Sequence, residues 1–180
     1  QAFKKIKLDR STIKPFIGVV GEIYVRSHVF SNDHLIRRLE SLGARVSLAS
    51  FAEWMYYTNF TRKRTAKRER QWKSAFVNWF KDQFQKRIER RLAEPFSGLI
   101  DDAVEVSTEE ILELSEPYIH DSFEGEAVLT IGKMIEYHHH NINGVVNVGP
   151  FTCMPSTVVS AIMKKLSSDL DDMPMMTIMY

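Results

Sequence analysis

Four short apolar runs, separated by stretches with helical spacing, restrict this chain to few folds. The runs lie at 16–20, 45–49, 145–148 and 175–180, and each is typical of a short buried strand. Strands that alternate with helices form parallel sheets, because each helix crosses back to the end of the sheet where the next strand starts. We therefore predict a doubly wound α/β fold with a mainly parallel, four-stranded sheet.

The residues between the runs show helix signals. Ser31-Asn32-Asp33 can cap a helix that contains Leu35, Ile36 and Leu39 and that ends at Gly43. Further helices are predicted at 51–59, 108–114, 124–140 and 156–170.

A long insertion, residues 60–120, separates the second and third runs. Its first part, 61–92, contains no Gly or Pro, and large apolar residues recur at Trp72, Phe76, Phe80, Phe84 and Ile88. This spacing predicts one helix of roughly 45 Å, longer than an ordinary crossover helix. We expect part of it to protrude or to pack on another domain or subunit, and we treat 1–180 as a single α/β domain with this insertion.

The insertion is strongly divided in charge. Residues 62–91 contain 12 Lys or Arg and 3 Asp or Glu, whereas 94–126 contain no Lys or Arg. Dense basic clusters are typical of nucleic-acid-binding helices. However, the aromatic residues keep a core-like spacing instead of forming a stacking platform, and the acidic segment nearly balances the charge. We therefore predict a solvated helix, or one paired with an acidic surface, and no nucleic acid partner.

The net charge, the cysteine count and the lengths of the apolar runs indicate the cellular compartment and exclude some classes of protein. The net charge of +1 indicates no particular partner, and the single cysteine excludes an internal disulfide framework. No apolar run reaches the ~18 residues of a membrane span. We predict a cytoplasmic protein without a membrane partner. Because the chain lacks an initiator Met and the last run stops at its end, we expect a fragment of a larger polypeptide.

Cys153 is the most informative candidate residue. It follows the third run and a Gly149-Pro150 break, and it precedes Pro155 and Ser156, which open a helix. Amides at a helix N-terminus favour negative charge and therefore favour a thiolate, which attacks electrophiles and binds soft metals. The alternative is that Cys153 only fills space in the core.

The turn after the first run, residues 21–26, is a second candidate region. Gly21 would allow close approach of a ligand or backbone, and Glu22 or Arg26 would supply polar groups. The turn matches neither a dinucleotide fingerprint nor a P-loop. With the strand order 2-1-3-4, it would face the 149–153 loop where strand order reverses, which is where such sheets bind ligands. The alternative is a turn with solvated charges.

The run His138-His139-His140 has the residue type of a metal site, but its spacing does not favour one. Adjacent residues of a helix point in different directions, so three together do not converge on one ion. We place them in the last turn of a helix, where cationic side chains suit the helix dipole. The Met-rich end, 173–179, is interpreted as core or interface.

Several of these stretches resemble the 2-hydroxyacyl-CoA (2-hydroxyglutaryl-CoA) dehydratase-related family. Gly149-Pro150-Phe151-Thr152-Cys153-Met154-Pro155-Ser156, with the helix that follows, is similar to the cysteine loop of these proteins. The nearest type is the large protein in which an activase-like ATPase region is joined to a dehydratase-like region. The 21–26 turn, Phe30-Ser31-Asn32-Asp33 and Phe123-Glu124-Gly125-Glu126-Ala127 are also similar, in the same order.

The resemblance implies iron–sulfur chemistry. In the dehydratases a [4Fe-4S] cluster is held by cysteines from more than one domain, an ATP-driven activase supplies a low-potential electron, and a 2-hydroxyacyl-CoA is dehydrated through a ketyl radical. Cys153 would be one cluster ligand, and Gly149 and Pro150 would shape its loop. We take these two residues, with Gly21 and Glu22, as candidate cofactor-binding positions.

One cysteine cannot hold a four-iron cluster, so the other ligands would come from missing domains of the parent chain. The isolated chain, which also lacks an ATPase motif, would be inactive and without the cluster. Acyl-CoA and a second copy of the chain are further candidate partners. The competing hypothesis is a non-catalytic α/β binding or assembly domain with a packed cysteine.

Overall fold

The computed structural model describes residue 5 and residues 12–70, 72–96 and 106–180. The chain divides into two compact units. Thr12–Phe51 and Glu109–Tyr180 form the first, which we call the α/β unit, and Ala52–Thr108 belongs to the second, which we call the helical unit. Within the described residues, no helix is long and apolar enough to cross a membrane.

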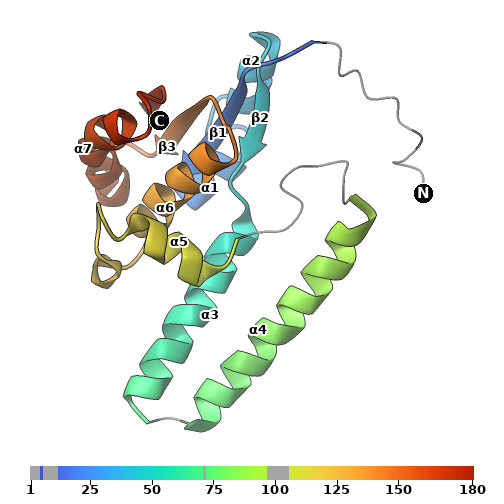
Figure 1. The fold of residues 1–180 in the computed structure, drawn as a ribbon, viewed down its shortest axis with the longest axis vertical. Coiled ribbons are helices and arrows are strands. Elements are labelled where there is room, and N and C mark those ends of the chain that lie inside the picture. The colour runs from blue at the N-terminus through green and yellow to red at the C-terminus, as the bar shows by residue number, and fades with distance from the viewer. Residues whose placement is uncertain (1–4, 6–11, 71, 97–105) are drawn as a thin grey trace. The chain divides into compact units, whose positions relative to one another are not determined.

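Four parallel strands form the sheet of the α/β unit (Figure 1). They are β1 (Phe16–Gly21), β2 (Arg45–Leu48), β3 (Gly144–Gly149) and β4 (Met175–Met179). The strand order is β2-β1-β3-β4, and every neighbouring pair is parallel. β3 is buried along its whole length, as expected for a central, Val-rich strand. The predicted parallel, four-stranded sheet is confirmed.

Helices connect and flank these strands. Their bounds are α1 (Ile23–Ser27), α2 (Leu35–Ser41), α5 (Thr108–Ser115), α6 (Glu126–His139) and α7 (Met154–Asp169), with a short 3-10 helix η3 (Asp121–Phe123). α1 and α2 lie on one face of the sheet, where Val25 and Leu35 share a core with Val19, Val146 and Val148.

α6 and α7 lie on the opposite face of the sheet. Successive strand residues point to opposite faces, and Gly18, next to Val19, faces α6. A Cβ on Gly18 would lie 2.3 Å from the ring of Tyr137. On the same face, the Ser160 hydroxyl of α7 lies 2.8 Å from the Thr177 hydroxyl of β4. Helices therefore cover both faces, which confirms the doubly wound α/β class.

The helical unit differs from its sequence-based prediction. It contains most of α3 (Phe51–Arg68), together with α4 (Trp72–Ala93) and a 3-10 helix η2 (Glu94–Phe96). The prediction of one helix over 61–92, preceded by another over 51–59, was wrong. α3 continues past 59 and ends before Arg70, which has a φ of 57°. No Gly or Pro marks this turn, so the sequence pattern contained no signal for it.

Other elements occur with shifted ends. α1, a helix of five residues, was not predicted. α6 begins at Glu126 instead of 124, because Glu124 and Gly125 have φ values of 52° and 83°, outside the helical range. α7 begins at Met154 instead of 156, with Pro155 in its first turn, where a proline costs no hydrogen bond.

Candidate functional site

The ends of β1 and β3 lie next to each other at the carboxyl edge of the sheet. Gly21 pairs with Val148, and the Glu22 N–H donates a 2.8 Å hydrogen bond to the Val148 carbonyl oxygen. Strand order reverses between these two ends, since β2 lies beyond β1 and β4 lies beyond β3. The 21–26 turn and the loop after Gly149 therefore start at neighbouring positions on adjacent strands.

Gly21 is required by both its conformation and its surroundings. Its φ is 110°, a conformation that favours glycine. A Cβ there would lie 2.0 Å from the Val148 carbonyl oxygen and 2.6 Å from Asn147 Oδ1. Gly21 thus allows a close approach, and the group that approaches it is the backbone of β3.

The carboxylate of Glu22 caps α1. One oxygen accepts the Tyr24 N–H at 3.1 Å and the other accepts the Val25 N–H at 2.7 Å. A carboxylate at this position satisfies N–H groups that have no partner within the helix and complements their positive charge. The geometry gives Glu22 a structural role in which both oxygens are engaged.

Arg26 is buried, and its guanidinium supports the same turn. Its Nη1 donates to the Gly21 carbonyl oxygen at 3.1 Å, and its Nη2 donates to the Ser50 carbonyl oxygen at 3.0 Å. These bonds join the end of β1 to the loop after β2. Arg26 therefore stabilises the backbone of the candidate site instead of presenting its charge to solvent.

Glu126 is a site residue that the sequence analysis did not single out by itself. Its Oε1 accepts the Ile23 N–H at 3.2 Å, so the start of α6 is bonded to the start of α1. Burial is the main cause that raises the pKa of this carboxyl above its usual range, and the negative charge of Glu22 raises it further. The hydrogen bond from Ile23 and the positive charge of Arg26 both lower the pKa, but they do not cancel the rise. The only sequence signal was its place in the Phe123-Glu124-Gly125-Glu126-Ala127 stretch, one of the stretches on which the sequence-based prediction of a family rests.

The Cys153 thiol lies at the start of α7. Cys153 is the N-cap residue, but its side chain makes no capping hydrogen bond, and it is partly exposed. Its N–H donates to the Pro150 carbonyl oxygen at 3.0 Å, which closes a turn in which Thr152 has a φ of 70°. Its carbonyl oxygen accepts both the N–H and the hydroxyl of Thr157, at 3.0 and 2.8 Å. The backbone of Cys153 is thus fixed by hydrogen bonds, whereas its side chain makes no capping bond.

Gly149 allows this loop to pack against α7. A Cβ on Gly149 would lie 2.2 Å from Ser156 Oγ and 3.8 Å from the Cβ of Cys153. The loop is also fixed to the end of the chain, since Phe151 N–H donates to the Tyr180 carbonyl oxygen at 2.8 Å and Tyr180 N–H donates to Gly149 at 3.0 Å. These contacts set the position of Cys153 beyond the end of β3.

No protein-family model, curated protein or solved structure matches this chain. The relation to the dehydratase-related proteins therefore stays a prediction from the sequence of the cysteine loop and of the stretches quoted with it.

A buried polar cluster lies beneath the two loops. Asn147 is completely buried, and its Nδ2 donates to Thr177 Oγ1 at 3.2 Å. Asn147 Oδ1, on the side of Gly21, has no hydrogen-bond partner among the described residues. A buried carbonyl oxygen can accept a hydrogen bond from a water or ligand N–H or O–H. The cluster therefore leaves one acceptor between the ends of β1 and β3.

The residues of the chain fit one ligand of an iron–sulfur cluster and not a whole site. Four-iron clusters are held by several cysteine thiolates, and Cys153 is the single cysteine of the sequence. In the part of the chain that the structure describes, no three His, Cys, Asp or Glu side chains form a group able to hold a metal ion. Any cluster bound at Cys153 would need further ligands from outside this chain.

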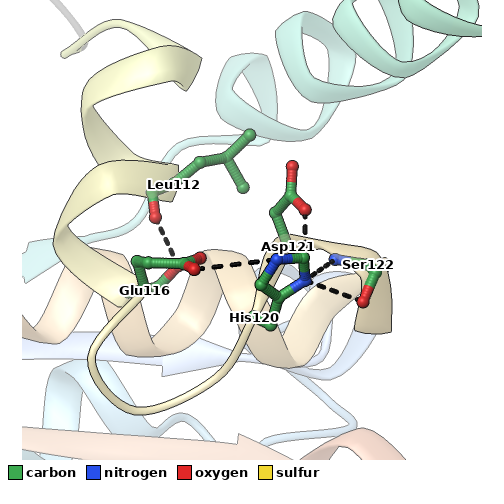
Figure 2. A network of polar contacts seen from close by, with 6 residues as sticks. Leu112, Glu116, His120, Asp121 and Ser122 are labelled. Carbon is green, nitrogen blue, oxygen red and sulfur yellow. Dashed lines mark hydrogen bonds and ion pairs between the residues drawn. The ribbon is translucent and has the colours of Figure 1, made fainter.

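A second polar cluster, in the loop between α5 and α6, has a structural role (Figure 2). His120 Nδ1 accepts the Ser122 N–H at 3.0 Å and caps η3. The same ring contacts Asp121 at 3.4 Å and, through Nε2, Glu116 at 3.7 Å. These contacts join the end of α5 to the segment that leads to α6.

The three histidines at the end of α6 do not converge. His138 Nε2 lies 3.2 Å from Asp171 Oδ2, while His140 Nδ1 lies 3.1 Å from Glu136 Oε1. The rings of His138 and His139 are 6.2 Å apart and inclined at 59°. The three rings therefore point in different directions, as expected for adjacent residues at the end of a helix.

Proposed function

We propose that this chain contributes one thiolate, that of Cys153, to an iron–sulfur cluster in a protein related to 2-hydroxyacyl-CoA dehydratases and their ATP-dependent activases. The observation that supports this proposal is a partly exposed cysteine residue at the start of α7, beyond the end of β3, where strand order reverses. A cysteine that only filled the core would be fully buried. The supporting geometry is independent of the sequence resemblance.

The residues around Cys153 would hold the ligand. Cys153 is the N-cap residue of α7, a helix of 16 residues, so it lies beside the N–H groups that have no partner within the helix. The bonds from Cys153 to Pro150 and Thr157 would fix the direction of the thiolate. Gly149 would allow the loop to close, and Gly21 and Glu22 would border the cofactor through the backbone.

The cluster, when bound, would supply low-potential electron transfer for the radical dehydration of an acyl-CoA in the parent protein. Its other ligands would come from further domains of that protein, because this chain has one cysteine. A thiolate kept free for a cluster needs a reducing compartment, so we place the protein in the cytoplasm.

Anaerobic iron and sulfide analysis of the parent protein, with electronic spectra, tests the proposal. We expect a cluster signal that is lost or altered in Cys153→Ser and unchanged in Phe151→Ala, because the Phe151 side chain is exposed in the same loop and has no ligand atom. Unfolding curves of both variants establish that they are folded. Equal iron and sulfide in Cys153→Ser and the unaltered protein would reject Cys153 as a ligand and favour a non-catalytic assembly domain.

A further inference from the structure

The helical unit presents a line of apolar and basic side chains that is separate from the cysteine loop. Val77, Phe80, Phe84, Arg87 and Arg91 of α4 follow one another at alternating spacings of three and four residues. With about 3.6 residues per turn, such a series forms one line along the helix, as in the contact line of a coiled coil. We call these five residues the α4 seam.

The side chains of the α4 seam are exposed. Phe80 and Phe84 are 61% and 58% exposed, and Phe76 beside them is 66% exposed. Since an aromatic side chain has about 150–250 Å² of surface, these three present on the order of 400 Å². This area is comparable to the largest apolar patch on a typical monomeric protein, and such patches are often functional.

α3 packs on the side of α4 that lies opposite to the seam. Tyr56 Oη donates to Glu89 Oε2 at 2.6 Å, and Asn59 Nδ2 donates to Gln85 Oε1 at 2.6 Å. The two helices form an antiparallel hairpin (Figure 1, teal and green). At about 100° per residue, Gln85 and Glu89 point away from the α4 seam. The partner helix within the hairpin therefore leaves the seam uncovered.

The two arginines of the seam have no partner among the described residues. Lys86, by contrast, pairs with Asp82 at 3.2 Å. A shallow hollow along α4 is lined by four seam residues, Phe80, Phe84, Arg87 and Arg91, and by their neighbours Gln83, Lys86 and Arg90. Along α4, the seam is thus apolar from Val77 to Phe84 and carries positive charge at Arg87 and Arg91, two side chains without a partner of opposite charge among the described residues.

We propose that the α4 seam binds an α-helix of a partner protein whose contact line is apolar at one end and acidic at the other. Leucine-like side chains would pack between Phe80 and Phe84, and carboxylates would pair with Arg87 and Arg91. Arginine suits such pairs because its planar head binds a carboxylate with two parallel hydrogen bonds. This proposal does not depend on the iron–sulfur function.

Charge distinguishes this occupant from a second copy of the chain. Parallel pairing of two α4 seams would place Arg87 and Arg91 against the same cations, with like-charge repulsion. Antiparallel pairing would place them against Val77 and Phe80, where they would lose water without gaining a carboxylate. A helix with complementary charge avoids both costs.

The position of the arginines in line with the aromatic residues also disfavours a lipid bilayer or a nucleic acid as the partner of the seam. Helices that lie on membranes keep their cations on the polar face, whereas Arg87 and Arg91 lie in line with Phe80 and Phe84. Nucleic acid would pair with the arginines but would leave the apolar half of the seam in contact with charged backbone.

The acidic α5 of this chain is engaged elsewhere. Its Ile111 and Leu112 are buried. A Cβ on Gly132 of α6 would lie 2.2 Å from the Ile111 carbonyl oxygen, so α5 packs closely on α6 within the α/β unit. The apolar side of α5 is therefore not available for the α4 seam.

Fluorescence anisotropy with labelled synthetic helical peptides and the full chain tests this proposal. The probe has leucine at three successive contact positions and glutamate at the next two, and it is made in both orders because the helix can run in either direction. We expect saturable binding for one order, weakened at least about tenfold by Arg87→Glu with Arg91→Glu. A peptide with lysine in place of glutamate should bind this double variant and not the unaltered chain.

The matched control is Lys67→Glu with Arg68→Glu, which makes the same charge change on exposed positions of α3. It should alter the affinity less than about twofold, since salt screens charges that are not in contact. The proposal is overturned if neither acidic peptide binds, or if both double variants weaken binding equally. It is also overturned if the chain dimerises through the seam, or prefers phosphatidylserine vesicles or an oligonucleotide to the acidic peptides.

Discussion

Gly21 and Val148 approach so closely that a Cβ on Gly21 would lie 2.0 Å from the Val148 carbonyl oxygen. The next residue, Glu22, donates its N–H to that same oxygen. The turn after β1 is therefore bonded to the end of β3 at the point where the candidate site begins.

This contact predicts that Gly21→Ala destabilises the α/β unit more than Gly43→Ala does. Both glycines have positive φ, 110° and 94°, but a Cβ on Gly43 would meet nothing within 4 Å. Gly43→Ala should cost the ~1–2 kcal/mol of backbone strain alone. Gly21→Ala should cost a further ~1–3 kcal/mol of overpacking. Urea unfolding of the two variants measures the difference, and equal midpoints would contradict the predicted contact.

The sequence predicted the sheet because its signal is local. The Val-rich run at 16–20 and the one at 145–148 form the two central strands, β1 and β3. Burial on both faces requires a nearly continuous apolar run, which can be read from a few adjacent residues. The position of Cys153 at the start of α7 also agrees with the local order of strand, Gly-Pro break and helix.

The features that the sequence did not predict depend on contacts between distant residues or on unusual turn residues. Glu126 reaches the Ile23 N–H across 103 positions, and no local pattern reports such a contact. α1 is capped by Glu22, although Ser, Thr, Asp and Asn are the usual caps. The turn between α3 and α4 uses Arg70 in a conformation that usually favours Gly or Asn.

The raised pKa of Glu126 predicts a pH-dependent difference between the unaltered chain and Glu126→Gln. Burial is the main cause of the raised pKa, so the folded state binds this proton more tightly than the unfolded state. That contribution to stability is complete below the ordinary value of 4.5 and is lost as the pH rises through the folded pKa. From pH 4 to 7, the unaltered chain should therefore lose stability relative to Glu126→Gln, whose amide oxygen can still accept the Ile23 N–H.

Urea midpoints of both proteins across this pH range measure the effect. Glu109→Gln is the control, because Glu109 is exposed and its curve should run parallel to that of the unaltered chain. A constant difference between Glu126→Gln and the unaltered chain at all pH values would contradict the predicted role of burial.

The hydrogen bond between Tyr56 and Glu89 predicts energetic coupling between α3 and α4. The Tyr56 hydroxyl lies 2.6 Å from Glu89 Oε2. In a double-mutant cycle, Tyr56→Phe and Glu89→Ala should show a coupling of about 1.5–3 kcal/mol, as expected for a bond to a charged acceptor. Tyr56→Phe with Ser160→Ala, which joins no shared contact, should be additive. Additive effects for the first pair would show that α3 and α4 are not joined at this point.

The partial exposure of Cys153 predicts that its thiol reacts in the folded protein. Its side chain makes no capping hydrogen bond, and its residue is neither buried nor fully exposed. One thiol per chain should react with an aromatic disulfide reagent more slowly than in urea but much faster than the chain unfolds. Cys153→Ser with Ser156→Cys moves the single thiol to a position only 2% exposed, where it should be protected until unfolding. If Cys153 reacted only at the unfolding rate, the thiol would be packed, and no partner could use it as a ligand without opening the loop.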